Sequence, residues 1–129
     1  MYNILLVENN IEDMKAASIA LGKNGHTILD ANNAGDCIRL AKELQPDLIL
    51  LATRLPGMDA FLTTRLLRSN PLTKNIKIIA LADDETAERD KLFQVGINEY
   101  LRKPFTFENL FSLIEEILNP PKELLRPRM

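Results

Sequence analysis

The sequence predicts a three-layer α/β fold, a doubly wound sheet of five parallel strands with helices on both faces. Two observations support this prediction. Short runs of Ile, Leu and Val, typical of strands buried on both faces, recur along the chain. Longer stretches between them carry apolar residues at helical spacing. Because the strand–helix unit is repeated five times, right-handed crossovers should place helices on both faces of the sheet.

The predicted strands differ in apolar content. Residues 4–7, 47–51 and 76–81 are almost wholly apolar and are expected to be central strands. Residues 26–29 and 99–101 form shorter runs that we place nearer the sheet edges. His26 begins one of these edge runs beside a glycine, which favours a solvent-facing side chain over a catalytic one.

The predicted helices each show an apolar row that should face the sheet. The rows are Met14, Ala17 and Leu21; Ala34, Ile38 and Ala41; Leu62 and Leu66; and Phe107, Leu110, Ile114 and Ile117. Residues 85–94 are predicted as a further helix from a sparser pattern. Cys37 lies in the second helix, where we expect it to be half-buried.

The helix ends carry capping signals. Asn10, Asn33 and Thr106 stand where a side-chain oxygen can accept the first free backbone N–H groups, and an acid follows each of the two asparagines three residues later. Glycines at positions 22, 25 and 96 are expected to end helices.

The chain has the size of one domain, which we assign to residues 1–118, with residues 119–129 as a proline-containing tail or linker. Its 16 basic and 18 acidic residues leave a formal net charge of −2, which argues against nucleic-acid binding by this domain. The sequence shows neither a secretory signal nor a run long enough to cross a membrane. With a single cysteine, a cytoplasmic location is expected.

Three stretches carry a more specific pattern: ILLVENN at 4–10, PDLILLATRLPGMD at 46–59 and YLRKPF at 100–105. Read together they resemble the receiver domain of response regulators in two-component signalling, and the resemblance extends from residue 3 to about residue 118. It implies a flavodoxin-like (βα)5 fold with strand order 2-1-3-4-5. In such sheets functional groups gather at the carboxyl ends of the strands.

The resemblance also implies a set of site residues. A working receiver holds Mg²⁺ with two acids after the first strand and an aspartate at the end of the third, and that aspartate accepts a phosphoryl group. A hydroxyl after the fourth strand and a lysine before a proline then bind the phosphoryl oxygens. At these positions this chain has Glu8, Asn9, Ala52, Ala82 and Lys103. Only the lysine matches fully, so no acyl phosphate can form at Ala52, and Mg²⁺ binding is expected to be weak or absent.

Other residues near this pocket leave alternatives open. Lys103 either pairs with Glu8, which would hold its loop in one state, or is a lysine inherited from the family without a present role. Thr53 is a poor substitute acceptor, because it should point to the opposite face of the strand. Asp59 and Asp83 lie on loops near the same edge and are expected to cap helices or to be solvated.

The leading hypothesis is a pseudo-receiver, a non-enzymatic module without cofactor that signals by phosphorylation-independent protein–protein interaction. Its partner would be a histidine kinase, an output domain, another regulator or a second copy of the chain. Candidate contact residues are Tyr100, which matches the switch aromatic of the family, and Phe111 and Leu118, which widen the apolar stripe of the last helix. Each of the three is also compatible with plain packing.

Two alternatives remain. The first is a conventional phosphorelay receiver that uses another acid. The second is a flavodoxin-like cofactor binder. Residues 8–12 argue against the cofactor binder, because this loop lacks glycine, serine and threonine, and its two acids would repel a phosphate group.

Overall fold

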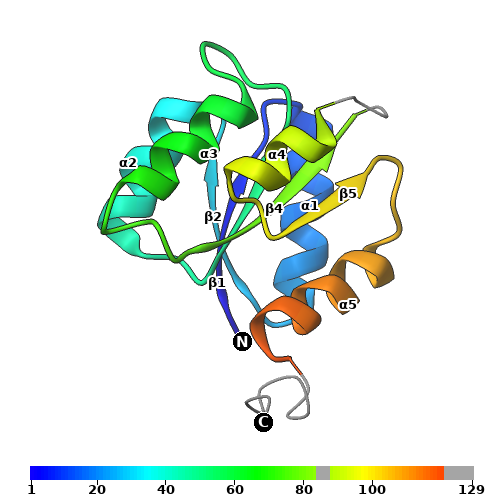
Figure 1. The fold of residues 1–129 in the computed structure, drawn as a ribbon. Helices are drawn as coiled ribbons and strands as arrows, with labels where there is room; N and C mark the ends of the chain where they lie inside the picture. The colour runs from blue at the N-terminus through cyan, green and yellow to red at the C-terminus, as the bar shows by residue number, and fades with distance from the viewer. Residues whose placement is uncertain (84–87, 121–129) are drawn as a thin grey trace, which may run out of the picture.

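In the described part of the chain, the sheet contains five parallel strands in the order β2-β1-β3-β4-β5. Figure 1 shows the fold. The computed structural model describes residues 1–83 and 88–120. The strands are β1 (Asn3–Val7), β2 (Thr27–Ala31), β3 (Leu48–Ala52), β4 (Lys77–Ala82) and β5 (Glu99–Arg102). The predicted fold class and strand order are therefore confirmed, and each strand boundary agrees with the predicted one to within two residues.

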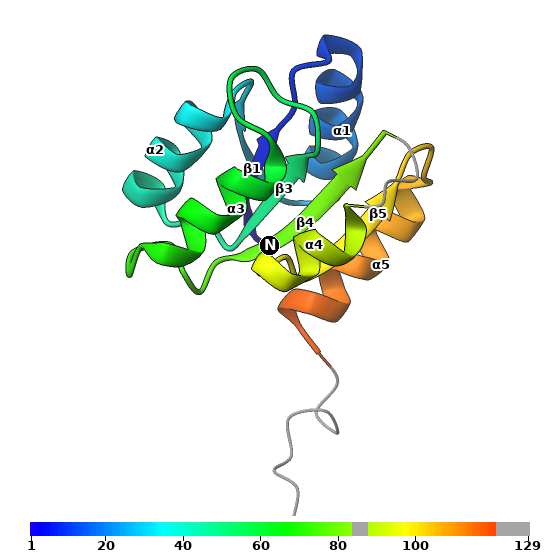
Figure 2. The same ribbon diagram turned by 45° about the horizontal axis from the view of Figure 1, so that its top comes forward.

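Within the described residues, five helices complete the three layers. They are α1 (Ile11–Lys23), α2 (Ala34–Leu44), α3 (Ala60–Ser69), α4 (Arg89–Val95) and α5 (Phe107–Leu118). Helices α1 and α5 cover one face of the sheet, and α2, α3 and α4 cover the other (Figure 2). No helix in the described part of the chain has the length and apolar character needed to span a bilayer.

Alternation along the strands divides the apolar core into two clusters, because successive side chains of a strand point to opposite faces. In β1, Leu5 and Val7 pack beneath α2, α3 and α4, whereas Ile4 and Leu6 pack beneath α1 and α5. All four side chains are fully buried. Burial of each such aliphatic side chain stabilises the fold by about 1.5–3 kcal/mol, which explains why the central strands are apolar on both faces.

The predicted N-caps are confirmed. The side chains of Asn10, Asn33 and Thr106 accept hydrogen bonds from backbone N–H groups three residues later, at distances of 2.8–3.1 Å. At the C-terminal ends the outcome is mixed. Gly96 ends α4 in the left-handed region (φ 119°), as predicted, whereas Gly22 lies inside α1, which continues to Lys23.

The predicted buried face of α3 is wrong. Leu62 and Leu66 are 44% and 40% exposed. The residues that face the sheet are Ala60, Thr63, Thr64 and Leu67. Thr63 tolerates burial because its hydroxyl donates to the Asp59 carbonyl at 2.7 Å. Apolar character alone therefore selected the wrong row of this helix.

Two further expectations need correction. His26 is not solvent-facing; only 9% of it is exposed, its ring stacks on Tyr2 at 5.5 Å, and its Nδ1 accepts a hydrogen bond from the Tyr2 backbone N–H at 3.2 Å. Cys37 is fully buried and not half-buried. Burial raises the pKa of its thiol to about 12, so this free cysteine behaves as a core residue.

Arg68 joins α3 to two other segments. Its guanidinium donates to the backbone carbonyls of Lys74 (2.9 Å), Ile76 (2.7 Å) and Gly96 (2.9 Å). It also donates to Asn98 Oδ1 at 3.1 Å. Arg68 therefore connects the end of α3, the approach to β4 and the turn between α4 and β5.

Two predicted segments fall partly outside the described residues. The predicted helix at 85–94 is observed as α4 from Arg89, and residues 84–87 lie outside the description. Of the predicted tail at 119–129, only residues 119 and 120 are described. The domain boundary near residue 118 therefore stays a prediction, although α5 ends at Leu118.

Candidate functional site

The predicted site residues meet at the carboxyl edge of the sheet. Glu8 follows β1, Ala52 ends β3, Ala82 ends β4 and Lys103 follows β5. The register pairs Val7 with Leu51, so Glu8, just after β1, and Ala52, the last residue of β3, lie at the ends of two adjacent strands. On the other side the Lys103 backbone N–H donates to the Ala82 carbonyl at 2.7 Å. Parallel pairing thus gathers side chains that are up to 95 residues apart in sequence.

Glu8 is a buried carboxylate, with 4% of the residue exposed. Its Oε1 accepts hydrogen bonds from the backbone N–H groups of Asn9 (3.1 Å) and Asn10 (3.2 Å). Its Oε2 accepts a hydrogen bond from Lys103 Nζ at 2.7 Å. Both oxygens are therefore engaged, as a buried charge requires. The predicted Glu8–Lys103 pair is confirmed, whereas Asn9 itself is exposed.

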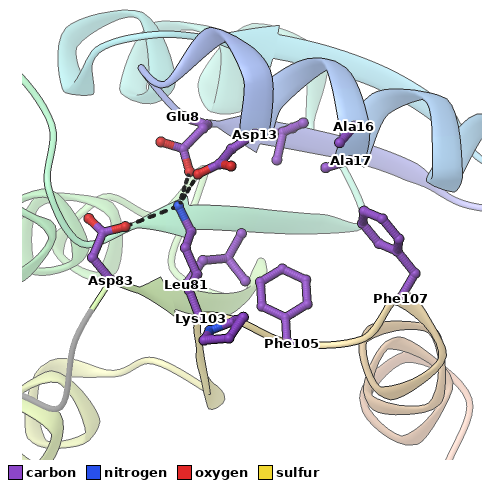
Figure 3. Close-up of a pocket in the computed structure, with 11 residues that line it drawn as sticks. Glu8, Asp13, Ala16, Ala17, Leu81, Asp83, Lys103, Phe105 and Phe107 are labelled. Carbon is purple, nitrogen blue, oxygen red and sulfur yellow. Dashed lines mark hydrogen bonds and ion pairs between the residues drawn. The ribbon is translucent and has the colours of Figure 1, made fainter.

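Lys103 pairs with two more carboxylates (Figure 3). Its Nζ lies 2.9 Å from Asp13 Oδ2 on α1 and 3.2 Å from Asp83 Oδ1 at the end of β4. Burial lowers the pKa of Lys103, but its hydrogen bonds to Glu8, Asp13 and Asp83 outweigh this effect and raise the pKa above its usual value. The ammonium is therefore held fully charged at neutral pH by three carboxylates from three segments of the chain.

Asp13 and Asp83 are the site residues that the sequence did not identify. The pattern placed Asp13 in the first turn of a helix, where an acid favours the helix dipole, and Asp83 on a capping or solvated loop. Asp83 is exposed, which agrees with the prediction of a solvated side chain, but the prediction did not include its ion pair with Lys103. Asp59 does cap α3, since its Oδ1 accepts the Leu62 N–H at 2.9 Å. The ion pairs of Asp13 and Asp83 with Lys103 could not be predicted from the sequence, because the prediction requires knowing which loops meet at this edge of the sheet.

The positions of Ala52 and Ala82 offer only methyl groups. Ala52 is 1% exposed and Ala82 is fully buried. Neither side chain can bind a metal, accept a phosphoryl group or donate a hydrogen bond. Among the residues that the structure describes here, the charged groups that meet are the carboxylates of Glu8, Asp13 and Asp83 and the ammonium of Lys103.

The residues present do not fit Mg²⁺, the metal that the resemblance implies. Mg²⁺ requires several oxygen ligands in near-octahedral arrangement. Both oxygens of Glu8 are engaged, and the Lys103 ammonium lies between the three carboxylates, so these cannot all coordinate one metal ion. Within residues 1–83 and 88–120, no group of three or more His, Cys, Asp or Glu side chains is arranged to hold a metal ion.

The three predicted contact residues do not form one surface. Tyr100 packs with the cluster beneath α2, α3 and α4, and the Arg89 guanidinium lies 5.9 Å from the centre of its ring. Phe111 and Leu118 pack with the cluster beneath α1 and α5. Phe111 also stacks on Phe107 at 6.3 Å. Each residue is partly buried by its own contacts, on opposite faces of the sheet.

A five-stranded sheet of this order, with an acid, a lysine and the LPGMD turn at its carboxyl edge, defines a signalling receiver domain. The chain belongs to the response regulator receiver domain family, whose model matches residues 4–115. Domains of this family are signalling modules of two-component systems.

Individual relatives agree. The chain is 33% identical to the protein PilH of Pseudomonas aeruginosa over 120 residues, which covers 92% of this chain and 98% of PilH. It is 31% identical to the phosphate regulon transcriptional regulatory protein PhoB of the same species, but spans only 51% of PhoB. The crystal structure of the receiver domain of sensor histidine kinase PA1611, also from P. aeruginosa, superimposes with a TM-score of 0.84 at 29% identity and covers 89% of this chain and 95% of that one. That structure has a magnesium ion coordinated in its active-site cleft.

Proposed function

We propose that this chain is a pseudo-receiver: a receiver domain that signals by binding another protein and not by accepting a phosphoryl group. The observation that carries the proposal is the methyl group of Ala52 at the end of β3, where the family's chemistry requires a carboxylate nucleophile. Ala82 likewise replaces the hydroxyl that would bind the transferred group.

The Lys103 network supports the same proposal. In a functioning receiver the lysine must be available to the phosphoryl oxygens. Here its ammonium faces Glu8, Asp13 and Asp83 at 2.7–3.2 Å, and Lys103 is only 17% exposed. Because three internal carboxylates already neutralise it, the lysine has little electrostatic reason to attract an incoming anion. The network favours a single, permanently closed arrangement of the site.

A partner would therefore recognise a fixed surface. We propose a signalling protein as the partner, meaning a histidine kinase, an output domain, another regulator or a second copy of this chain, and we place the interaction in the cytoplasm. Tyr100 on one face and Phe111 with Leu118 on the other remain the candidate contact residues. Because they lie on opposite faces, they should be tested separately.

The phosphorylation test is intact-mass spectrometry after incubation with acetyl phosphate and Mg²⁺. We expect no added phosphoryl mass on the unmodified chain. The matched control combines Asn9→Asp, Ala52→Asp and Ala82→Thr, which restores the family's pattern and should gain the phosphoryl group. Phosphorylation of the unmodified chain would disprove the proposal and favour a conventional receiver that uses another acid. Repeating the reaction with Asp13→Asn and Asp83→Asn would then identify that acid.

The interaction test is capture of partners by the immobilised chain, compared with Tyr100→Ala and Phe111→Ala as separate variants. We expect one of the two to lose the captured signalling protein and the other to retain it. Unchanged capture by both would show that neither residue contributes to the interface. Sedimentation of the purified chain reports whether the partner is a second copy. A flavin absorbance in the purified protein would instead support the cofactor-binding alternative.

A further inference from the structure

A cavity of about 440 Å³ lies beside the Lys103 network and extends between α1 and the segment that leads into α5 (Figure 3). Its volume falls in the range of about 300–1,000 Å³ that is typical of small-molecule sites. Glu8, Asp13, Asp83 and Lys103 line the charged end. Ala16, Ala17, Phe105 and Phe107 line the apolar end. Ligand sites commonly combine a mostly apolar wall with a few polar groups in this way.

The apolar end exists because α1 offers small residues where it faces two aromatic rings. Ala16 and Ala17 contribute only methyl groups on the helix side. Opposite them, the rings of Phe105 and Phe107 meet edge to face with their centres 6.2 Å apart. Phe107 is further held by its stacking on Phe111. These contacts fix the wall, so the space is formed before any ligand arrives, and it suits a compact apolar group.

The charged end of the cavity determines whether a cationic or an anionic ligand can bind. An ammonium has three N–H donors, and those of Lys103 face three carboxylates at 2.7, 2.9 and 3.2 Å. Lys103 therefore has no donor left for an anion. Each carboxylate, in contrast, can accept further hydrogen bonds. Three carboxylates and one ammonium also leave a formal charge of −2 (+1 − 3 = −2), which attracts cations and repels anions.

We propose that this cavity binds a small primary amine with a compact apolar body. The amine would donate hydrogen bonds to the carboxylates of Asp13 and Asp83, and its body would lie against Ala16 and the Phe105 ring. The inference goes beyond the proposed function and does not depend on it, because amine binding involves no phosphoryl chemistry. Such a ligand would contact α1 and the entry to α5 together, giving the domain a small-molecule input.

Isothermal titration calorimetry of the unmodified chain with phenethylamine tests the proposal. We expect saturable binding at one site. Phenethyl alcohol keeps the apolar body without the charge and should bind at least about tenfold more weakly, since a charge-assisted hydrogen bond is lost. Hydrocinnamate, which carries a carboxylate, should not bind. Absence of saturable phenethylamine binding, or equal affinity for the alcohol, would overturn the proposal.

Two pairs of variants locate the site. Asp13→Asn should weaken phenethylamine binding about tenfold, whereas Glu12→Gln removes a neighbouring exposed charge outside the cavity and should leave binding unchanged. Ala16→Phe should fill the apolar end and abolish binding, whereas Ile19→Phe enlarges an exposed side chain of the same helix that does not line this cavity. Circular dichroism checks that each variant is folded.

The control variants distinguish binding in this cavity from an effect of general surface charge. If Glu12→Gln weakens binding as much as Asp13→Asn, general surface charge explains the affinity and the proposal is wrong. If Ala16→Phe binds normally while folded, the amine does not occupy this cavity. Neither result bears on phosphorylation, because the mass measurement on the unmodified chain tests the proposed function independently.

Discussion

Two basic side chains tie distant segments of this chain together, and they do so with different partners. Lys103 faces three carboxylates at the carboxyl edge of the sheet. Arg68 faces uncharged backbone carbonyls and one amide oxygen between α3, β4 and β5. Burial lowers the pKa of Arg68, whereas the carboxylates more than offset burial at Lys103 and raise its pKa.

The difference separates a structural clamp, meaning Arg68 with its hydrogen-bond acceptors, from the candidate site around Lys103. The Arg68 partners are main-chain atoms, so their geometry follows from the fold itself. The Lys103 partners are side chains, so their number and charge can change while the sheet stays the same. The fold itself tolerates wide sequence divergence, since solved response-regulator and receiver structures superimpose with TM-scores of 0.84–0.86 at 22–29% identity.

The largest expected effect is at the clamp. Arg68→Ala removes the hydrogen bonds that the guanidinium donates to two segments, the approach to β4 and the turn between α4 and β5, and leaves their carbonyl groups with fewer partners. We expect the free energy of unfolding to fall by about 4 kcal/mol. Urea denaturation measures the change, and Arg65→Ala, at an exposed position of the same helix, is the matched control. A loss no larger than that of the control would show that the clamp contributes little.

Lys103→Met should have the next largest effect. It leaves the buried Glu8 carboxylate without a cation and leaves three neighbouring negative charges without their shared ammonium. We expect the free energy of unfolding to fall by about 3 kcal/mol, after allowance for the partial exposure of Asp13 and Asp83. Because the folded-state pKa of Lys103 is raised, its contribution is complete below about pH 10.4, the ordinary lysine value, and is lost as the pH rises through the folded-state pKa.

The measurement for Lys103 is urea denaturation at neutral and at strongly alkaline pH. The unmodified chain should lose stability at the alkaline pH by more than Lys103→Met does. Lys42→Met, in α2, controls for removal of a lysine charge. Equal alkaline losses in the unmodified chain and in Lys103→Met would contradict the assignment.

Gly96→Ala tests the contact between Arg68 and one of its backbone acceptors, the Gly96 carbonyl. Gly96 has φ +119°, and an added Cβ would lie 2.8 Å from Cγ and Nε of Arg68. We expect a loss of about 2 kcal/mol from backbone strain and displacement of the guanidinium. The control is Gly22→Ala, inside α1 with open space around the added methyl group, which should stabilise by about 0.5–1 kcal/mol. Thermal denaturation of the two variants distinguishes them by the sign of the shift.

His26 gives the smallest effect and extends the comparison to a basic group that the fold keeps neutral. Burial and the positive N-terminus lower its pKa, although Glu115 acts in the opposite direction. Stability from neutral His26 is therefore present above about pH 6.5 and is lost as the pH falls through the lowered folded-state pKa. Protonation also removes the acceptor for the Tyr2 N–H, at about 1 kcal/mol.

The His26 measurement compares urea midpoints at pH 7.5 and 5.5 for the unmodified chain and for His26→Gln. The variant should show the smaller acid loss, since other titrating groups act equally on both proteins. An identical loss in the two proteins would show that His26 does not titrate in this range.

The sequence predicted the architecture well because local patterns determine it. Apolar runs identified the strands, and Asn10, Asn33 and Thr106 marked helix starts through contacts only three residues long. The sequence-based prediction was wrong where packing between distant segments determines which side chains are buried. Leu62 and Leu66 carry the expected spacing, yet the register of α3 on the sheet buries Thr63 and Thr64 instead.

The site shows the same division. The resemblance identified Glu8, Ala52, Ala82 and Lys103, because each follows or ends a recognisable strand. It did not identify Asp13, whose partner lies 90 residues away in sequence, or assign Asp83 to an ion pair. Arg68 was likewise missed, because none of its carbonyl acceptors has a sequence signature. Side chains that act across loops become visible only when the topology brings those loops together.

The Lys103 network joins β1, α1, the end of β4 and the entry to α5 through one atom, Nζ. Separating any one of these segments from the others means breaking an ion pair in a partly desolvated place, so local fluctuations at this edge are opposed. A protein that docks here would meet a surface already in its final shape, and little conformational entropy would be lost on complex formation.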